Sequence, residues 1–253
     1  MILKFFFQYI PKKYLLFKIN FFSIFNISNI YHDEIDNCIS KNIFRYNSNG
    51  LLYCLIEPEI DDYPNYCIFL SPGNSSIFSY FKGCTNLKYE NYKNKACNIK
   101  IFIYQNYSFY RNEYKKFLSL DEGFIEINNE ALNFFKSIFS GEILFFGHSL
   151  GSYNSSRISK NLAIICNPFD IYEEIGISTK CKLIEDISKN KSKIYLCISG
   201  KYDNVCLKTI PKISNYENVY LKEIETSHYF SEFGYNLFNS LIEVFIELNE
   251  ILK

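Results

Sequence analysis

The stretch that decides the fold is EILFFGHSLGSYNSSRIS, residues 142–159. An apolar segment, residues 142–146, leads directly into Gly147-His148-Ser149-Leu150-Gly151, and a segment able to form a helix follows. A G-x-S-x-G sequence between a strand and a helix is typical of a sharp turn that lifts the serine Oγ out of a sheet. The segment therefore predicts a strand, a strained turn and a helix, in that order.

The residue types around Ser149 suit nucleophilic chemistry. Small residues two before and two after the serine, Gly147 and Gly151, let the strained backbone pass close to its neighbours. The N-terminus of the following helix supplies its dipole and free N–H groups where an oxyanion would form. We expect Ser149 to be a nucleophile and the N–H of Leu150 to be one oxyanion donor.

Short apolar runs and amphipathic stretches alternate along the rest of the chain. The runs predicted as strands are residues 51–56, 66–70, 99–104, 142–146, 162–166, 194–199 and 219–225. Several are apolar at both alternating positions, as strands buried on both faces of a parallel sheet should be. Helical spacing predicts helices over residues 122–139 and 233–252. The pattern predicts an α/β fold: a mostly parallel, doubly wound sheet with helices on both faces, in one domain over residues 51–253.

The first 50 residues form a hydrophobic and aromatic segment that begins MILKFFFQYI. No uninterrupted apolar run reaches the ~18–20 residues of a membrane-spanning helix. The segment could pack on the core of the domain. It could also be an interfacial anchor, because it mixes Phe and Leu with Lys. The sequence leaves both interpretations open.

Composition excludes several classes of protein. Lys plus Arg and Asp plus Glu each number 27, so the net charge is zero, which argues against a nucleic-acid partner. The nine cysteines are never spaced C-x-x-C, which argues against a zinc ribbon and a dithiol redox motif. We expect no cofactor and no metal. A reducing compartment is the simplest expectation, so we expect a cytoplasmic protein, with membrane association through the N-terminus as an addition.

A general base is expected after the serine in the chain. His228 is the one histidine that follows Ser149, and it lies just past the last predicted strand, where a loop can carry it to the carboxyl edge of the sheet. His148 lies inside the turn and is expected to point elsewhere. His32 is expected on the surface.

The carboxylate that orients His228 should lie on a neighbouring loop. Asp203 follows the predicted strand 194–199, directly upstream of the strand that leads to His228, and is the favoured candidate. Asp170, after the strand 162–166, is the alternative. Asp186 lies in a polar stretch and is expected to be a solvated surface charge.

The second oxyanion donor is expected in the loop after the strand 66–70. That loop reads Ser71-Pro72-Gly73-Asn74, in which a glycine permits close approach of the backbone to a reacting carbonyl. We expect the N–H of Asn74 to join that of Leu150. An ordinary Pro-Gly turn is the alternative.

In order and spacing these motifs resemble an α/β-hydrolase of the serine-hydrolase superfamily, over residues 51–248. The similarity is greatest to the small cap-less branch that holds the protein depalmitoylases of the α/β-hydrolase-domain group. Residues 71–74 stand at the family's S-H-G-N loop, residues 167–169 at its S-P-F, residues 193–205 at its acid segment and residues 225–228 at its histidine segment. The resemblance implies a Ser149–His228–Asp203 triad and little or no lid.

The resemblance also implies an activity. A serine hydrolase would cleave a carboxylic ester or thioester through an acyl-enzyme, with an acyl ester or thioester as its partner. The chain departs from the family at Pro72, where the family has histidine, and in residues 104–111, which lack the family's glycines. A catalytically silent scaffold that acts by binding, and a serine peptidase with the same triad, are the alternatives.

Overall fold

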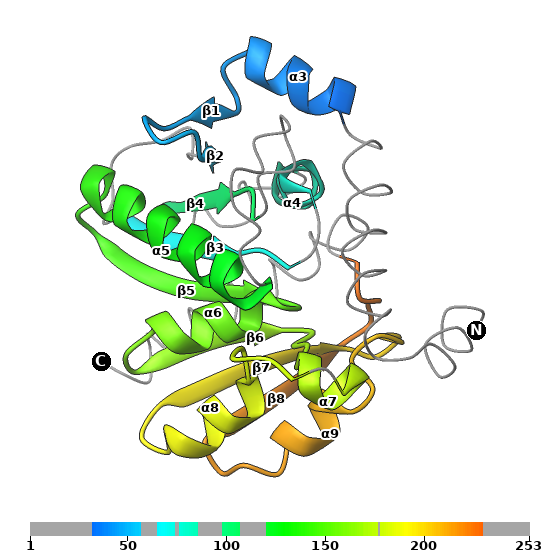
Figure 1. Cartoon of the computed structure of the whole chain (residues 1–253). Helices are drawn as coiled ribbons and strands as arrows, with labels where there is room; N and C mark the ends of the chain where they lie inside the picture. Colours follow the sequence, from blue (N-terminus) through cyan, green and yellow to red (C-terminus); the bar gives the residue numbers. More distant parts are fainter. Residues whose placement is uncertain are drawn as a thin grey trace.

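The computed structural model describes residues 32–56, 65–73, 76–85, 98–106, 120–176 and 178–229 (Figure 1). Within this part of the chain an eight-stranded sheet has the order β1-β2-β4-β3-β5-β6-β7-β8. The strands are β1 (Arg45–Tyr46), β2 (Leu52–Ile56), β3 (Asn65–Ser71), β4 (Asn98–Tyr104), β5 (Glu142–His148), β6 (Leu162–Cys166), β7 (Ile194–Gly200) and β8 (Val219–Ile224). β2 runs antiparallel to both of its neighbours, and every other pair is parallel.

The sequence-based prediction of a mostly parallel α/β sheet is confirmed. Each predicted strand is present, and no predicted end differs from the observed one by more than two residues. β1 was not predicted because it has two residues, both exposed, and so carries no periodic signal. The predicted helix 122–139 corresponds to α5 (Leu120–Ile138). The predicted helix 233–252 lies outside the described residues.

Helices cover both faces of the sheet (Figure 1). Besides α5, they are α3 (His32–Ser40), α4 (Ile77–Thr85), α6 (Gly151–Ile158), α7 (Ile171–Ile175), α8 (Leu183–Lys189) and α9 (Thr209–Ile213). α3 and α4 contribute to the hydrophobic cluster on one face, and α5, α8 and α9 contribute to clusters on the other. This arrangement explains why the central strands carry apolar side chains on both faces along most of their length.

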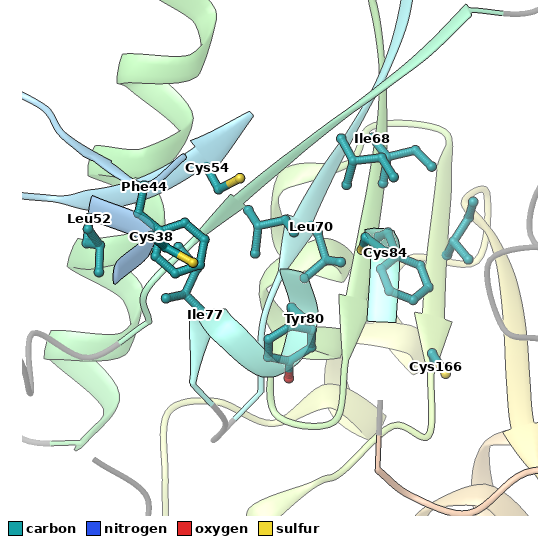
Figure 2. Close-up of a cluster of buried hydrophobic side chains, with 14 of the residues drawn as sticks. Cys38, Phe44, Leu52, Cys54, Ile68, Leu70, Ile77, Tyr80, Cys84 and Cys166 are labelled. Carbon is teal, nitrogen blue, oxygen red and sulfur yellow. The ribbon is translucent and has the colours of Figure 1, made fainter. Parts of the chain in front are cut away.

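β3 illustrates the division between the two faces. Ile68 and Leu70 lie in the cluster with α4, whereas Phe69 packs with Phe102 and Phe135 of α5, with ring centroids 4.9–5.7 Å apart (Figure 2 shows the α4 side). Successive side chains of a strand point to opposite faces, so a strand between two helical layers must be apolar throughout. Much of the aromatic content of the chain is therefore ordinary core.

The described end of the N-terminal segment belongs to the same core. Ile35 and Cys38 of α3, together with Phe44, are buried in the cluster that holds Leu52 and Cys54 of β2 (Figure 2). Residues 1–31 lie outside the described residues. No helix in the described part of the chain is both long and apolar enough to cross a membrane.

The strand order determines where a site can form. From β3 the chain moves to β4 on one side and then to β5 on the other, so the sheet has its topological switch point at β3 and β5. Ligands of open α/β sheets bind in the crevice outside the carboxyl ends of the strands at such a point. Ser71 pairs with Gly147 at that end, which brings the loops after β3 and β5 together. The connection from β6 to β7 holds the short helices α7 and α8 and no cap domain in its described residues.

Phe135→Ala should destabilise the fold, because the ring is fully buried between α5 and the sheet (0% exposed). We expect a loss of ~3–5 kcal/mol in the free energy of unfolding, measured by urea denaturation. Ile138→Ala on the same helix is the control, because that side chain is 48% exposed and should change stability by less than ~1 kcal/mol. Equal losses for the two variants would contradict the packing of α5.

Candidate active site

The turn after β5 holds Ser149 in a left-handed backbone conformation, with φ of 55°. Such a conformation is uncommon outside glycine and costs on the order of 1–3 kcal/mol, so surrounding contacts must impose it. The Ser149 N–H donates to the Cys166 carbonyl (2.9 Å), and the Ser149 carbonyl accepts from the N–H groups of Ser152 (3.1 Å) and Phe169 (3.2 Å). Both backbone groups of the serine are thus tied to the end of β6 and the start of α6.

The two glycines are required by close backbone packing. A Cβ on Gly151 would lie 1.9 Å from the carbonyl oxygen of Ser71, and one on Gly147 would lie 2.3 Å from the carbonyl oxygen of Gly151. Real Cβ atoms do not approach backbone so closely, so neither position accepts a side chain without a backbone shift. The first turn of α6 therefore lies directly against the end of β3.

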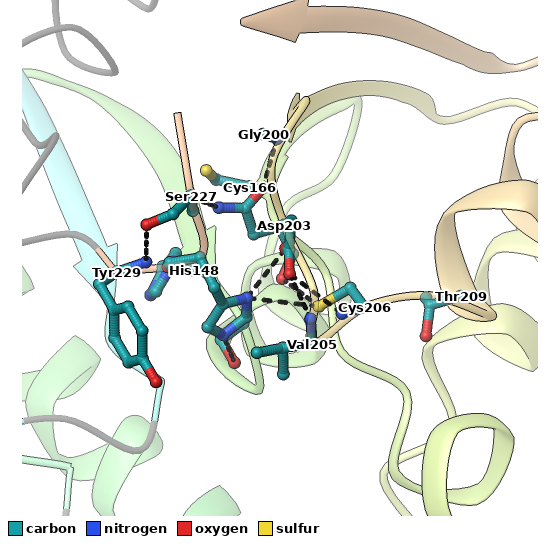
Figure 3. A network of polar contacts seen from close by, with 12 residues as sticks. His148, Cys166, Gly200, Asp203, Val205, Cys206, Thr209, Ser227 and Tyr229 are labelled. Atoms are coloured by element: carbon teal, nitrogen blue, oxygen red, sulfur yellow. Dashed lines mark hydrogen bonds and ion pairs between the residues drawn. The ribbon is translucent and has the colours of Figure 1, made fainter. Parts of the chain in front are cut away.

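The structure brings Ser149, His228 and Asp203 together. The Nε2 atom of His228 lies 3.1 Å from Ser149 Oγ, and its Nδ1 atom lies 2.9 Å from Asp203 Oδ2. Asp203 Oδ1 accepts from the N–H groups of Val205 (2.7 Å) and Cys206 (3.1 Å) (Figure 3). The carboxylate favours the imidazole tautomer with its proton on Nδ1, which leaves the Nε2 lone pair to accept the serine proton.

Asp203 is held in its charged form. Burial by itself would raise the pKa of the carboxyl group, but the hydrogen bond and charge attraction of His228 and the two backbone amides outweigh burial, so the pKa lies below its usual value. The carboxylate is therefore ionised at neutral pH and can stabilise an imidazolium at His228.

The other histidine and carboxylate candidates do not join this group. His148 is buried and points away from Ser149 Oγ, because Nδ1 contacts the Tyr80 hydroxyl and Nε2 the carbonyl oxygen of His228, at 2.9 Å each. Burial, together with the nearby His228, lowers the pKa of His148 to about 3. His32 begins α3, the helix that precedes the edge strand β1 in the chain.

Asp170 and Asp186 both have structural partners. Asp170 caps α7 and accepts from the N–H groups of Glu173 and Ile184, at 3.0 Å each. The expectation that Asp186 is a solvated surface charge is wrong: it is half-buried on α8 and accepts from the hydroxyl of Ser156. The polar sequence around Asp186 gave no sign of a partner that comes from α6.

The predicted oxyanion donors are described in part. Among the described residues no acceptor binds the Leu150 N–H. Gly73 lies against the serine, because a Cβ there would be 2.7 Å from Ser149 Cβ. Asn74 lies outside the described residues, so its role stays a prediction.

Asn106 is a residue whose role the sequence did not indicate. Its side-chain amide donates to the carbonyls of Pro72 (3.1 Å) and Gly73 (3.3 Å) and so holds the loop after β3 in place.

Asn167, which the sequence analysis placed in a family motif, has a structural role that was not predicted. It follows β6 with φ of 41°, a conformation that asparagine tolerates better than most residues. Its Oδ1 accepts from the Gly200 N–H (2.7 Å), and its Nδ2 donates to the carbonyl of Ser227 (3.0 Å). Asn167 thus joins the loops after β6, β7 and β8. The sequence offered one sign of this role, an asparagine directly after a predicted buried strand.

Asp203, Cys206 and His228 also place potential metal ligands within 4.8 Å of one another. Burial and the nearby Asp203 charge raise the pKa of the Cys206 thiol well above its usual value. The protonated Sγ contacts the Asn167 carbonyl at 3.1 Å, and the Asp203 oxygens already accept from His228 and two amides. These contacts fit a hydrogen-bonded group better than a zinc site, in which cysteine binds as the thiolate.

The sheet order and the turn at Ser149 define the α/β-hydrolase fold, and comparison with solved structures shows that fold for this chain. An alpha-beta serine hydrolase homologue from Coxiella burnetii matches with a TM-score of 0.53 and 15% identity, over 79% of this chain and 94% of that one. S-formylglutathione hydrolase from Staphylococcus aureus matches with a TM-score of 0.55 and 14% identity, over 80% and 96%. The thioesterase domain from the curacin biosynthetic pathway matches with a TM-score of 0.53 and 9% identity, over 79% and 98%.

The likeness is one of structure and not of sequence. No family model matches the sequence. No curated protein matches it either.

Asp203→Asn should destabilise the protein in a pH-dependent way. Because the folded-state pKa of Asp203 is depressed, its contribution to stability is present above the unfolded pKa of about 3.9 and is lost as pH falls through the folded pKa. We expect a loss on the order of 2 kcal/mol at pH 6 and a smaller one at pH 3, by urea denaturation. The exposed Glu223 supplies the control: Glu223→Gln should show no such difference. A loss that grows towards pH 3 would contradict the assignment.

Proposed function

We propose that the protein is a serine hydrolase that cleaves a carboxylic ester or thioester through an acyl-enzyme. The observation that carries the proposal is the continuous contact from Asp203 through His228 to Ser149, with distances of 2.9 and 3.1 Å, at a serine whose φ is 55°. A nucleophile, a base and an orienting carboxylate in this geometry are the arrangement of acyl-transfer enzymes on unrelated folds.

Each residue has a defined step. Ser149 Oγ attacks the acyl carbon while His228 Nε2 takes its proton, and Asp203 stabilises the imidazolium that forms. His228 then gives the proton to the leaving alkoxide or thiolate, and a water molecule, activated by the same base, releases the acid. The N–H of Leu150, joined by that of Asn74, stabilises the oxyanion of both tetrahedral intermediates.

The proposed substrate class is supported by the resemblance, by the structural neighbours and by the short connection between β6 and β7. The resemblance to depalmitoylases favours an acyl thioester, and two of the structural neighbours are called an S-formylglutathione hydrolase and a thioesterase domain. α7 and α8 are short, and Leu183 and Ile187 of α8 are buried against the sheet, so the described β6–β7 connection does not form a cover over the serine. An acyl group presented on a large carrier suits such a site, and residues 1–31 would carry any membrane contact.

Ser149→Ala should abolish covalent labelling by a fluorophosphonate probe, because the probe forms its bond to an activated serine Oγ. The measurement is in-gel fluorescence of the purified protein, with circular dichroism to show that the variant is folded. Ser137→Ala, which removes an exposed hydroxyl on α5, should label like the wild-type protein. Persistent labelling of Ser149→Ala would contradict the nucleophile, and absence of labelling in the wild-type protein would favour a silent scaffold.

A substrate comparison tests the leaving group. We expect hydrolysis of p-nitrophenyl butyrate and of an S-acylated cysteine peptide, measured as nitrophenolate release and free-thiol formation. Asp203→Asn should lower kcat by a factor of ~10⁴, because the imidazole loses its correct tautomer. Cleavage of unacylated peptides at comparable kcat/KM would assign the protein to the peptidases instead.

A further inference from the structure

A second buried hydrogen-bond chain lies beside the triad and is not needed to form it. The N–H of Gly73 lies 2.7 Å from the hydroxyl of Tyr80 on α4, and that hydroxyl lies 2.9 Å from Nδ1 of His148. The Nε2 atom of His148 lies 2.9 Å from the backbone carbonyl oxygen of His228. Tyr80 projects from α4 into the core (Figure 2), and His148 lies close to Asp203 and Cys206 (Figure 3).

The direction of each hydrogen bond in this chain can be assigned. A carbonyl oxygen only accepts, so His148 must carry its proton on Nε2 and donate to His228. The burial that lowers the pKa of His148 keeps its ring neutral, so Nδ1 is an acceptor. The Tyr80 hydroxyl therefore donates to His148 and accepts from Gly73. All the donors along the path point the same way, from the loop after β3 to the loop that carries the base.

One end of this hydrogen-bond path lies beside the expected oxyanion donor, and the other end is the backbone of the proposed general base. Gly73 precedes the expected oxyanion donor and lies in contact range of Ser149 Cβ. The carbonyl at the other end belongs to His228, the residue whose ring faces Ser149 Oγ at 3.1 Å. The chain also passes through His148, which immediately precedes the nucleophile. A shift of either loop must therefore stretch a hydrogen bond to Tyr80 or His148.

We propose that Tyr80 and His148 are positioning residues. They hold the loop after β3, at Gly73, and the loop after β8, at His228, in fixed positions relative to each other and to Ser149. This inference rests on the proposed hydrolase function and adds to it two residues that touch neither the substrate nor the proton in transfer. Neutral buried donors and acceptors suit this task because their geometry is fixed and independent of pH across the working range.

The alternative for both side chains is simple packing, and the hydroxyl of Tyr80 separates the two explanations. Tyr80→Phe keeps the ring that fills the core and removes only the link between Gly73 and His148. His148→Leu fills the space without any hydrogen bond. His148→Gln places an amide donor near the position of Nε2 and so keeps the link to the carbonyl of His228 alone.

Two measurements on the full chain test the proposal: kcat and KM for p-nitrophenyl butyrate, and the rate of phosphonylation of Ser149 by a fluorophosphonate. We expect Tyr80→Phe to lower kcat and the phosphonylation rate about tenfold each with KM within twofold, because the lost contacts act on the transition state. His148→Leu should lose more, and His148→Gln should recover part of that loss. The double variant Tyr80→Phe/His148→Leu should lose less than the product of the single losses, since both changes break one path.

Tyr195→Phe is the matched control, because it removes another buried tyrosyl hydroxyl, one bonded to Ser156 near the C-terminal end of α6. It should keep wild-type rates whatever its effect on the melting temperature. Wild-type rates in Tyr80→Phe, or losses that multiply in the double variant, would overturn the proposal. If His148→Leu fails to fold, Tyr80→Phe and His148→Gln decide alone. An unreactive wild-type protein would instead overturn the hydrolase function itself.

Discussion

The left-handed backbone at Ser149 is the constraint on which the rest of the site depends. A serine does not adopt φ of 55° without support, and the support comes from β6, whose last carbonyl binds the Ser149 N–H, and from the start of α6. α6 can begin there only because Gly151 allows contact with the carbonyl of Ser71 at the end of β3. Ser149 is thus held by three adjacent parallel strands, β3, β5 and β6, rather than by its own loop.

The remaining groups reach the serine because parallel strands end at one edge. β7 ends before Asp203 and β8 before His228, and the pairing of Gly200 with Ile224 sets their loops side by side. Asn167 then connects these loops to the end of β6 through Gly200 and Ser227. The ring of His228 contacts the Asp203 carboxylate, and its backbone carbonyl accepts from His148.

The features that could be predicted from the sequence are those encoded by a few consecutive residues. The strands buried between two helical layers show unbroken apolar runs, and the turn at Ser149 shows its glycines, so both could be predicted from a few consecutive residues. Asp186 was misjudged and the roles of Asn106, Asn167 and Tyr80 were missed, because their partners lie on other elements. A half-buried aspartate that accepts from Ser156 has the same sequence surroundings as a solvated one.

The sequence by itself determined the α/β class, the order along the chain of the proposed serine, acid and base, and the glycines that allow close backbone packing at Ser149. The tertiary structure places Asp203 within hydrogen-bond distance of His228, whereas Asp170 caps α7. It also decided that His148 turns away from the serine and binds Tyr80 and the backbone of His228. The physical reason is that hydrogen bonds act over about 3 Å, and only folding brings residues far apart in the chain to that distance.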